Sequence, residues 1–149
     1  MNPYGDGDAA RLAAAIHVLL RVFTVNERAF PSAEGRMRYN PLDFQTIGAV
    51  AARPGLRGAD LARHLGVVPT TAQSCIDRLA RRGLIAKGPG GRGLRLTTEG
   101  EAVAAAIRRQ DVSNMTRMLA VLPPERRGPL IADIEAIAAA MEAEAEGAA

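Results

Sequence analysis

The sequence predicts a mainly α-helical fold that carries a small β-wing. Apolar residues make up 48% of the 149 residues but aromatic residues only 3%, so Ala, Leu, Ile and Val must form the core, and Ala-rich sequence favours helix. Residues 58–82 read as two short helices around a tight turn at Gly66, and residues 84–97 as a hairpin with the tip GPGGRG. Together these elements predict a winged helix-turn-helix.

The N-terminal segment predicts a dimerisation helix. Residues 8–30 read as a helix with two apolar stripes and one polar face. A helix that is apolar on two sides is buried on two sides. Its second neighbour could belong to a partner chain, or the helix could be the central helix of a monomer. The polar third face favours the dimer. Residues 31–41, rich in Pro, Gly, Ser and Asn, follow as a loop.

Pro, Gly and capping residues predict where the other helices begin and end. Pro41 opens a helix that runs to about Ala52, before a short extended segment at 56–57. Thr98, with Glu101 three residues later, predicts a capping box at the start of a long helix that ends near residue 122. After the break at 123–124, a final helix extends to about Ala145. Its apolar stripe consists of Leu130, Ile134, Ile137 and Met141.

These boundaries predict three parts in the chain. Residues 1–40 form an N-terminal dimerisation helix and loop, residues 41–98 form the winged helix-turn-helix, and residues 99–149 form C-terminal dimerisation helices. Positive charge is concentrated in the middle part. Residues 53–95 contain nine Lys or Arg and two Asp, a net charge of +7, whereas the remaining residues contain ten basic and fourteen acidic side chains, a net charge of −4. Such a basic surface attracts a polyanion by releasing its counterions.

The second helix of the unit and the wing carry side chains suited to double-stranded DNA. The second helix of a helix-turn-helix enters the major groove, where Gln can pair with adenine, Arg with guanine and Ser or Thr with several groups. The glycine-rich tip allows a close approach, and its Arg can reach a narrow minor groove. We predict phosphate contacts from Arg57, Lys87 and Arg95. The other predicted DNA contacts are Thr70, Thr71, Gln73, Ser74, Arg78, Arg81 and Arg92.

The run from Leu61 to Gly100 resembles the MarR family of bacterial transcriptional regulators. The matching segments are LARHLG, IDRLARRGLI and a wing ending in LRLTTEG, and with one helix before and two after the unit the resemblance covers nearly the whole chain. It implies an obligate homodimer built from the first and the last two helices. It also implies a palindromic operator and, usually, repression relieved by a small phenolic or other lipophilic ligand.

The chain departs from the family pattern at four points. Arg57 and Val68 stand where the family usually has Ser or Thr helix caps, and Ser74 replaces a common Arg on the recognition helix. The wing is about two residues shorter than usual and lacks the Asp that normally pairs with its Arg. In the family the ligand site lies between the dimerisation helices and the DNA-binding lobe. In this chain that region could draw on His17, Arg21, Tyr39 and Phe44.

Cys75 has two possible roles. It could be a small core residue of the second helix, or a thiol whose oxidation would disturb that helix. Arg78 and Arg81 could lower the pKa of the thiol if they lie close to it. A single Cys excludes an internal disulfide and a multi-Cys zinc site, and two scattered His make no metal set.

The remaining function classes have little support in the sequence. It contains no catalytic grouping and no phosphate-loop or dinucleotide fingerprint, so we expect neither an enzyme nor a cofactor. No run is long enough to span a membrane and no signal peptide is visible, so we expect a cytoplasmic protein. The alternative function that stays open is a winged-helix adaptor that binds a protein and has no specific DNA site. Such an adaptor would bind DNA with little salt dependence.

Overall fold

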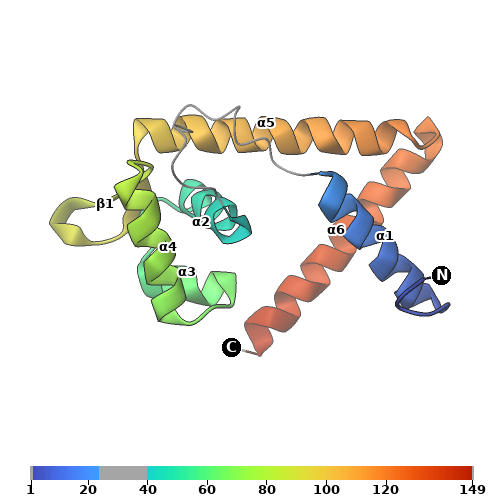
Figure 1. The fold of residues 1–149 in the computed structure, drawn as a ribbon, viewed down its shortest axis with the longest axis horizontal. Coiled ribbons are helices and arrows are strands. Elements are labelled where there is room, and N and C mark those ends of the chain that lie inside the picture. Colours follow the sequence, from blue (N-terminus) through green and yellow to red (C-terminus); the bar gives the residue numbers. More distant parts are fainter. Residues whose placement is uncertain (1, 24–39, 149) are drawn as a thin grey trace.

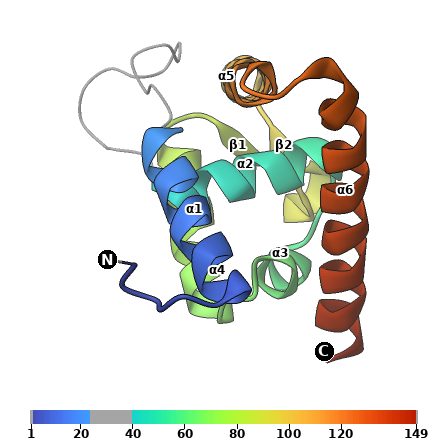
Figure 2. The same cartoon turned by 90° about the vertical axis from the view of Figure 1, so that its right-hand side faces the viewer.

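The computed structural model describes residues 2–23 and 40–148, and it has the predicted winged helix architecture with N- and C-terminal helices. The long helix α5 joins a lobe formed by α2, α3, α4 and the wing to an opposite end formed by α1 and α6 (Figure 1). Both views show α6 turning back from the end of α5 toward the level of α3 (Figure 1, Figure 2). The elements are α1 (Asp8–Val22), α2 (Pro41–Ala52), α3 (Gly58–Leu65), α4 (Pro69–Arg81), β1 (Ile85–Lys87), η2 (Pro89–Gly91), β2 (Leu94–Leu96), α5 (Thr98–Ala120) and α6 (Pro124–Gly147).

Most predicted boundaries agree with these bounds within a few residues. The helix predicted over 8–30 has Phe23 as its C-cap, and the rest of that prediction lies outside the described residues. The predicted cap at Thr98 is wrong. Thr97 is the N-cap of α5, because its hydroxyl accepts the Gly100 N–H at 3.0 Å and also donates to the Gly83 carbonyl. The same side chain therefore starts α5 and anchors the turn after α4.

The hydrophobic core lies in the lobe and is centred on α2. This helix contacts α3, α4, α5 and β2. Its Ile47 and Val50 are almost completely buried, together with Leu61 of α3 and Leu79 of α4. The core continues past residue 98 into the first turns of α5, where Val103 has no exposed surface. The start of α5 is therefore packed as part of the lobe.

The wing is a short antiparallel hairpin that is tied to the lobe by a third segment. Ile85 pairs with Leu96 and Lys87 with Leu94. Leu56 forms an isolated bridge to Leu94, which confirms the extended segment predicted between α2 and α3. Gly93 has a φ of +69°, and a Cβ there would lie 2.6 Å from the Gly55 carbonyl oxygen. Glycine thus lets the base of the wing lie directly on the loop after α2.

The helices at the other end leave much apolar surface exposed. No residue of α1 or α6 is buried in the single chain. Leu12 and Leu20 of α1 are 61% and 68% exposed, and Ile137 and Met141 of α6 are each 54% exposed. The lobe can bury its own core, whereas these two helices cannot do so within one chain.

A close contact at Gly100 leads to a test of the packing between α5 and the wing. A Cβ at Gly100 would lie 2.0 Å from the Leu84 carbonyl oxygen, so the backbone must shift to admit it. We expect Gly100→Ala to lower the free energy of unfolding by about 1–3 kcal/mol. Gly48→Ala, at a helical glycine with no atom within 4 Å, should raise it by up to about 1 kcal/mol. Urea unfolding of both variants measures the difference, and equal stabilities would contradict the packing argument.

Candidate nucleic-acid interface

The turn between α3 and α4 presents one face of α4 to solvent. Gly66 ends α3 in the left-handed conformation, with φ +65° and ψ +33°, as predicted. Pro69 opens α4, and Val68 makes no side-chain cap. The inward face of α4 consists of the buried residues Ala72, Cys75, Ile76 and Leu79. Their burial leaves the opposite, polar face of the recognition helix in contact with water.

Several predicted DNA-contacting side chains share this exposed face, and two of them form hydrogen bonds within α4. Gln73 donates to the Asp77 carboxylate at 2.8 Å, and Ser74 donates to the Thr70 carbonyl at 3.0 Å. These i, i+4 hydrogen bonds orient the carboxamide and the hydroxyl on the helix surface. Thr71 and Arg81 are exposed on the same helix. The face therefore offers short donors and acceptors at its N-terminal half and a cation at its C-terminal end.

A hollow of about 550 Å³ lies between α3, α4 and the wing. Three of the predicted cations line it: Arg57 before α3, Lys87 on β1 and Arg92 at the wing tip. Gln73 also lines it from α4. The hollow lies at the N-terminus of α3, where Arg57 makes no side-chain cap, so backbone N–H groups add to the positive potential. This arrangement suits a phosphate group. Arg95 is exposed on β2 and does not line the hollow.

Arg78 differs from its neighbours, and the prediction that it lies on the exposed face is wrong. Its side chain is only 23% exposed and forms an ion pair with Asp43 of α2, which has no exposed surface. Nε donates to Asp43 Oδ1 at 3.1 Å, and Nη2 donates to the same oxygen. This pairing raises the pKa of Arg78 above its ordinary value. A buried carboxylate needs such a partner, which explains why the guanidinium turns inward.

The Asp43 carboxylate also closes the N-terminus of α2. Its Oδ2 accepts the Asn40 backbone N–H at 3.0 Å, and the Asn40 side chain accepts the Asp43 N–H at 2.9 Å. The sequence did not predict this role of Asp43. The spacing of Asn40 and Asp43 is a capping-box signal that could have been found, but the partner 35 residues away carries no signal in the sequence.

Cys75 is a buried core residue, as the first of its two predicted roles requires. It is 2% exposed, and burial raises the pKa of its thiol despite the opposing influence of Arg78, whose Nη2 lies 3.4 Å from Sγ. The alternative prediction of a lowered pKa is therefore wrong. Its thiol is kept in the neutral, poorly nucleophilic form.

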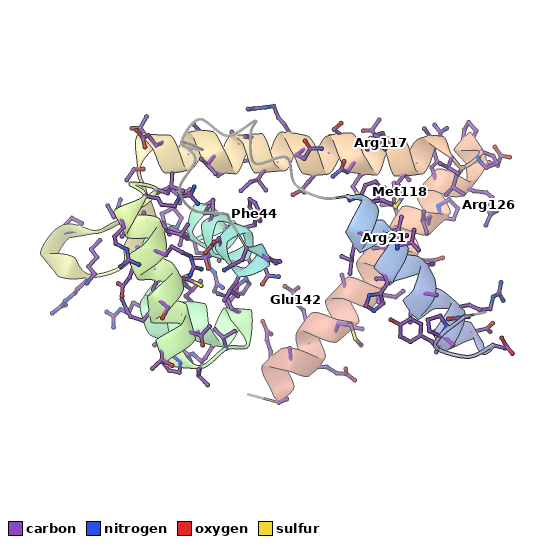
Figure 3. The ribbon with its side chains drawn as sticks, viewed as in Figure 1. Arg21, Phe44, Arg117, Met118, Arg126 and Glu142 are labelled. Atoms are coloured by element: carbon purple, nitrogen blue, oxygen red, sulfur yellow. The ribbon has the colours of Figure 1, made fainter. Side chains whose placement is uncertain are left out.

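The three predicted ligand residues that the structure describes, His17, Arg21 and Phe44, do not come together in one chain. His17 stacks on Tyr4 with ring centroids 5.4 Å apart, and Tyr39 lies outside the described residues. Figure 3 shows Arg21 on α1 and Phe44 on α2, on separate parts of the molecule. Phe44 lines a groove of about 560 Å³ between α2 and α5. The other residues along this groove are Gln45, Ile47, Gly48, Ala51, Ala52, Ala104, Ile107, Arg108 and Asp111.

Among residues 2–23 and 40–148, no group of three or more His, Cys, Asp or Glu side chains could hold a metal ion. Within the same residues, no helix is both long enough and apolar enough to cross a bilayer.

The comparisons with known proteins point to one family. Residues 39–95 match the model of the MarR family. Among curated proteins, no sequence matches the chain.

Solved structures share the fold over most of their length. A Mycobacterium tuberculosis MarR family protein in complex with DNA is 22% identical, with a TM-score of 0.67 over 89% of this chain and 98% of the other. The PcaV regulator from Streptomyces coelicolor, with its natural ligand, is 25% identical, with a TM-score of 0.56 over 89% and 90%. The transcriptional repressor CouR, bound to p-coumaroyl-CoA, is 22% identical, with a TM-score of 0.64 over 89% and 91%.

Proposed function

We propose that this chain, which belongs to the MarR family of DNA-binding transcriptional regulators, is a homodimeric repressor of a palindromic operator that a small ligand releases. The observation that carries the proposal is the exposed polar face of α4 beside the cationic hollow of the wing. A solved structure of the same fold is a complex with DNA. Regulators of this family are not enzymes. The proposed place of action is the cytoplasm, where the DNA lies.

In the proposed complex, α4 reads the major groove and the hollow holds a phosphate. Thr70, Thr71, Gln73 and Ser74 face base edges, and Arg81 lies at the far end of the same face. Arg57 and Lys87 bind the backbone from the hollow, and Arg95 from the wing strand. Arg92 extends from the wing tip toward the minor groove. Each phosphate that is neutralised makes the salt dependence of binding steeper.

Salt dependence provides the test of this DNA interface. We expect the full chain to enrich one sequence from a random duplex library. Lys87→Gln and Arg92→Gln each remove one cation from both protomers of the dimer, so each should weaken binding and reduce the slope of log K against log salt by up to about 1.8. Arg126→Gln is the control, because Arg126 lies at the opposite end of the molecule from the wing (Figure 3).

The control should leave the slope unchanged. If the wild type enriched no sequence and bound all duplexes with little salt dependence, the adaptor alternative would replace specific DNA binding.

The occupant proposed for the exposed apolar faces of α1 and α6 is a second copy of the chain. Burying side chains such as Leu20 and Ile137 against a partner would remove apolar surface that the single chain leaves in water. A hollow of about 420 Å³ at the junction of α1 and α5 adds to this surface. It is lined by Leu19, Val22, Phe23, Arg117, Met118, Val121 and Leu122. A two-fold dimer would also present two copies of α4 to two half-sites of a palindrome.

A charge on the apolar stripe of α6 should separate the dimer. We expect Ile137→Asp to shift the protein from dimer to monomer in sedimentation velocity, because a carboxylate cannot be buried in an apolar interface without a partner. Ala139→Asp places the same charge about 200° around α6 and should leave the dimer intact. A wild-type monomer at micromolar concentration, or equal behaviour of the two variants, would contradict the proposed interface.

The groove between α2 and α5 is the proposed effector site. Its walls are mainly apolar, and Arg108 offers a cation at its edge. These features suit a lipophilic or phenolic acid whose ring lies against Phe44 and whose carboxylate meets Arg108. The CouR structure of the same fold holds an aromatic acyl thioester, p-coumaroyl-CoA. In this proposal the ligand binds better to a dimer whose two α4 helices are spaced so that they do not fit the half-sites of the operator. The ligand therefore shifts the population toward the dimer that does not bind DNA.

The free acid p-coumarate is a suitable probe for this site. We expect it to dissociate the complex with the enriched duplex, and Arg108→Gln to raise the required concentration about tenfold through the lost charged hydrogen bond. Arg109→Gln, at the neighbouring exposed residue outside the groove, is the matched control. Equal responses of both variants would show that Arg108 does not bind the carboxylate.

A further inference from the structure

We propose that Arg78 positions the recognition helix and does not itself read a base. The proposal rests on the proposed DNA-binding function and concerns how α4 is held for it. Arg78 belongs to the segment that resembles other regulators, and its place on α4 predicted an exposed side chain. The structure instead directs its guanidinium to the buried Asp43 of α2.

The contacts of Arg78 fix α4 to α2 at one point. Nε and Nη2 both donate to Asp43 Oδ1, while Asp43 Oδ2 is occupied by the Asn40 N–H. Both oxygens of the carboxylate are therefore engaged. Arg78 Nη2 also lies 3.4 Å from Cys75 Sγ, one turn earlier on α4. The guanidinium is held by its own helix and by α2, so its planar fork sets the rotation of α4 about its axis.

The same contacts leave little of Arg78 available to DNA. A base contact would require its guanidinium to leave Asp43, and that would strand a carboxylate with no exposed surface. Arg81, one turn later on α4, provides the contrast. It is exposed, and no ion pair to it occurs in the described part of the chain. Of these two arginines, Arg81 is placed to meet DNA and Arg78 is placed to hold the helix.

Asp43 separates the two roles experimentally, because a residue with no exposed surface cannot touch DNA. The experiment measures the affinity of the full chain for its enriched duplex over a range of salt concentrations. The variants are Asp43→Asn, Arg78→Lys, Arg78→Gln and the double variant of Asp43→Asn with Arg78→Gln. Arg81→Gln is the matched control. Thermal unfolding confirms that each variant is folded at the assay temperature.

Positioning predicts that Asp43→Asn reproduces the effect of changing Arg78. Asp43→Asn and Arg78→Gln should each weaken specific binding about tenfold or more, which is about the cost of one mismatched base pair. The slope of log K against log salt should stay unchanged in both variants. Arg78→Lys should also weaken specific binding, because lysine keeps the positive charge but lacks the planar guanidinium with its two donors. The double variant should bind no more weakly than Arg78→Gln alone. Arg81→Gln removes one cation from each protomer of the dimer and should reduce the salt slope by up to about 1.8.

Three binding results would each overturn the positioning role. They are wild-type affinity in Asp43→Asn, wild-type affinity in Arg78→Lys, or a salt slope reduced in Arg78→Gln as much as in Arg81→Gln. A wild type that enriches no duplex would refute the proposed function separately. Hydrogen exchange without DNA then tests the contact between Arg78 and Asp43 directly. Asp43→Asn should speed exchange of the α4 amides more than exchange of the α3 amides. Equal exchange in the two helices would also overturn it.

Discussion

The buried carboxylate of Asp43 is the constraint on which the arrangement of the lobe depends. A charge with no exposed surface is tolerated only when it is paired and hydrogen-bonded. Asp43 meets this requirement with the Asn40 N–H on one oxygen and with Arg78 on the other. The start of α2 and the rotation of α4 are therefore set by one side chain. Since α2 also contacts α3, α5 and β2, the carboxylate ties α4 to the helix on which the core of the lobe is centred.

Ion pairs take part of the positive charge of residues 53–95 away from the surface that could meet a polyanion. Charge counting treats the nine cations of residues 53–95 alike, but their partners differ. Arg78 is held inside the lobe, and Arg63 pairs with Asp60 on α3. Arg57, Lys87 and Arg92 instead surround the hollow beside the wing. The surface available for a polyanion is thus smaller than the net charge suggests, and it is concentrated where α3, α4 and the wing meet.

The sequence predicts local structure well because local structure has local causes. Gly66 ends α3 through its left-handed conformation, and Pro41 opens α2, both from preferences of single residues. The errors concern choices that depend on distant parts of the chain. Thr97 caps α5 in place of its neighbour because its hydroxyl also reaches Gly83. Arg78 turns inward because of a carboxylate 35 residues away, and neither periodicity nor composition encodes such a pair. The groove beside Phe44 likewise depends on how α5 lies against α2, so sequence could suggest only its region.

The two sides of α2 connect the proposed effector groove to the recognition helix. Phe44 lines the groove toward α5, while the adjacent Asp43 holds Arg78 on α4. Breaking a buried ion pair by removing one partner costs about 3–5 kcal/mol, which is more than most ligand-induced couplings of about 1–3 kcal/mol. A ligand that displaces α2 would therefore leave the pair intact, and α4 would move with α2. Under the proposed function, release from DNA then takes the form of a joint shift of α2 and α4 relative to α5. The effector needs to favour only one position of α2 and α4 against α5 over another, and it does not need to unfold α4 or change its DNA-reading face.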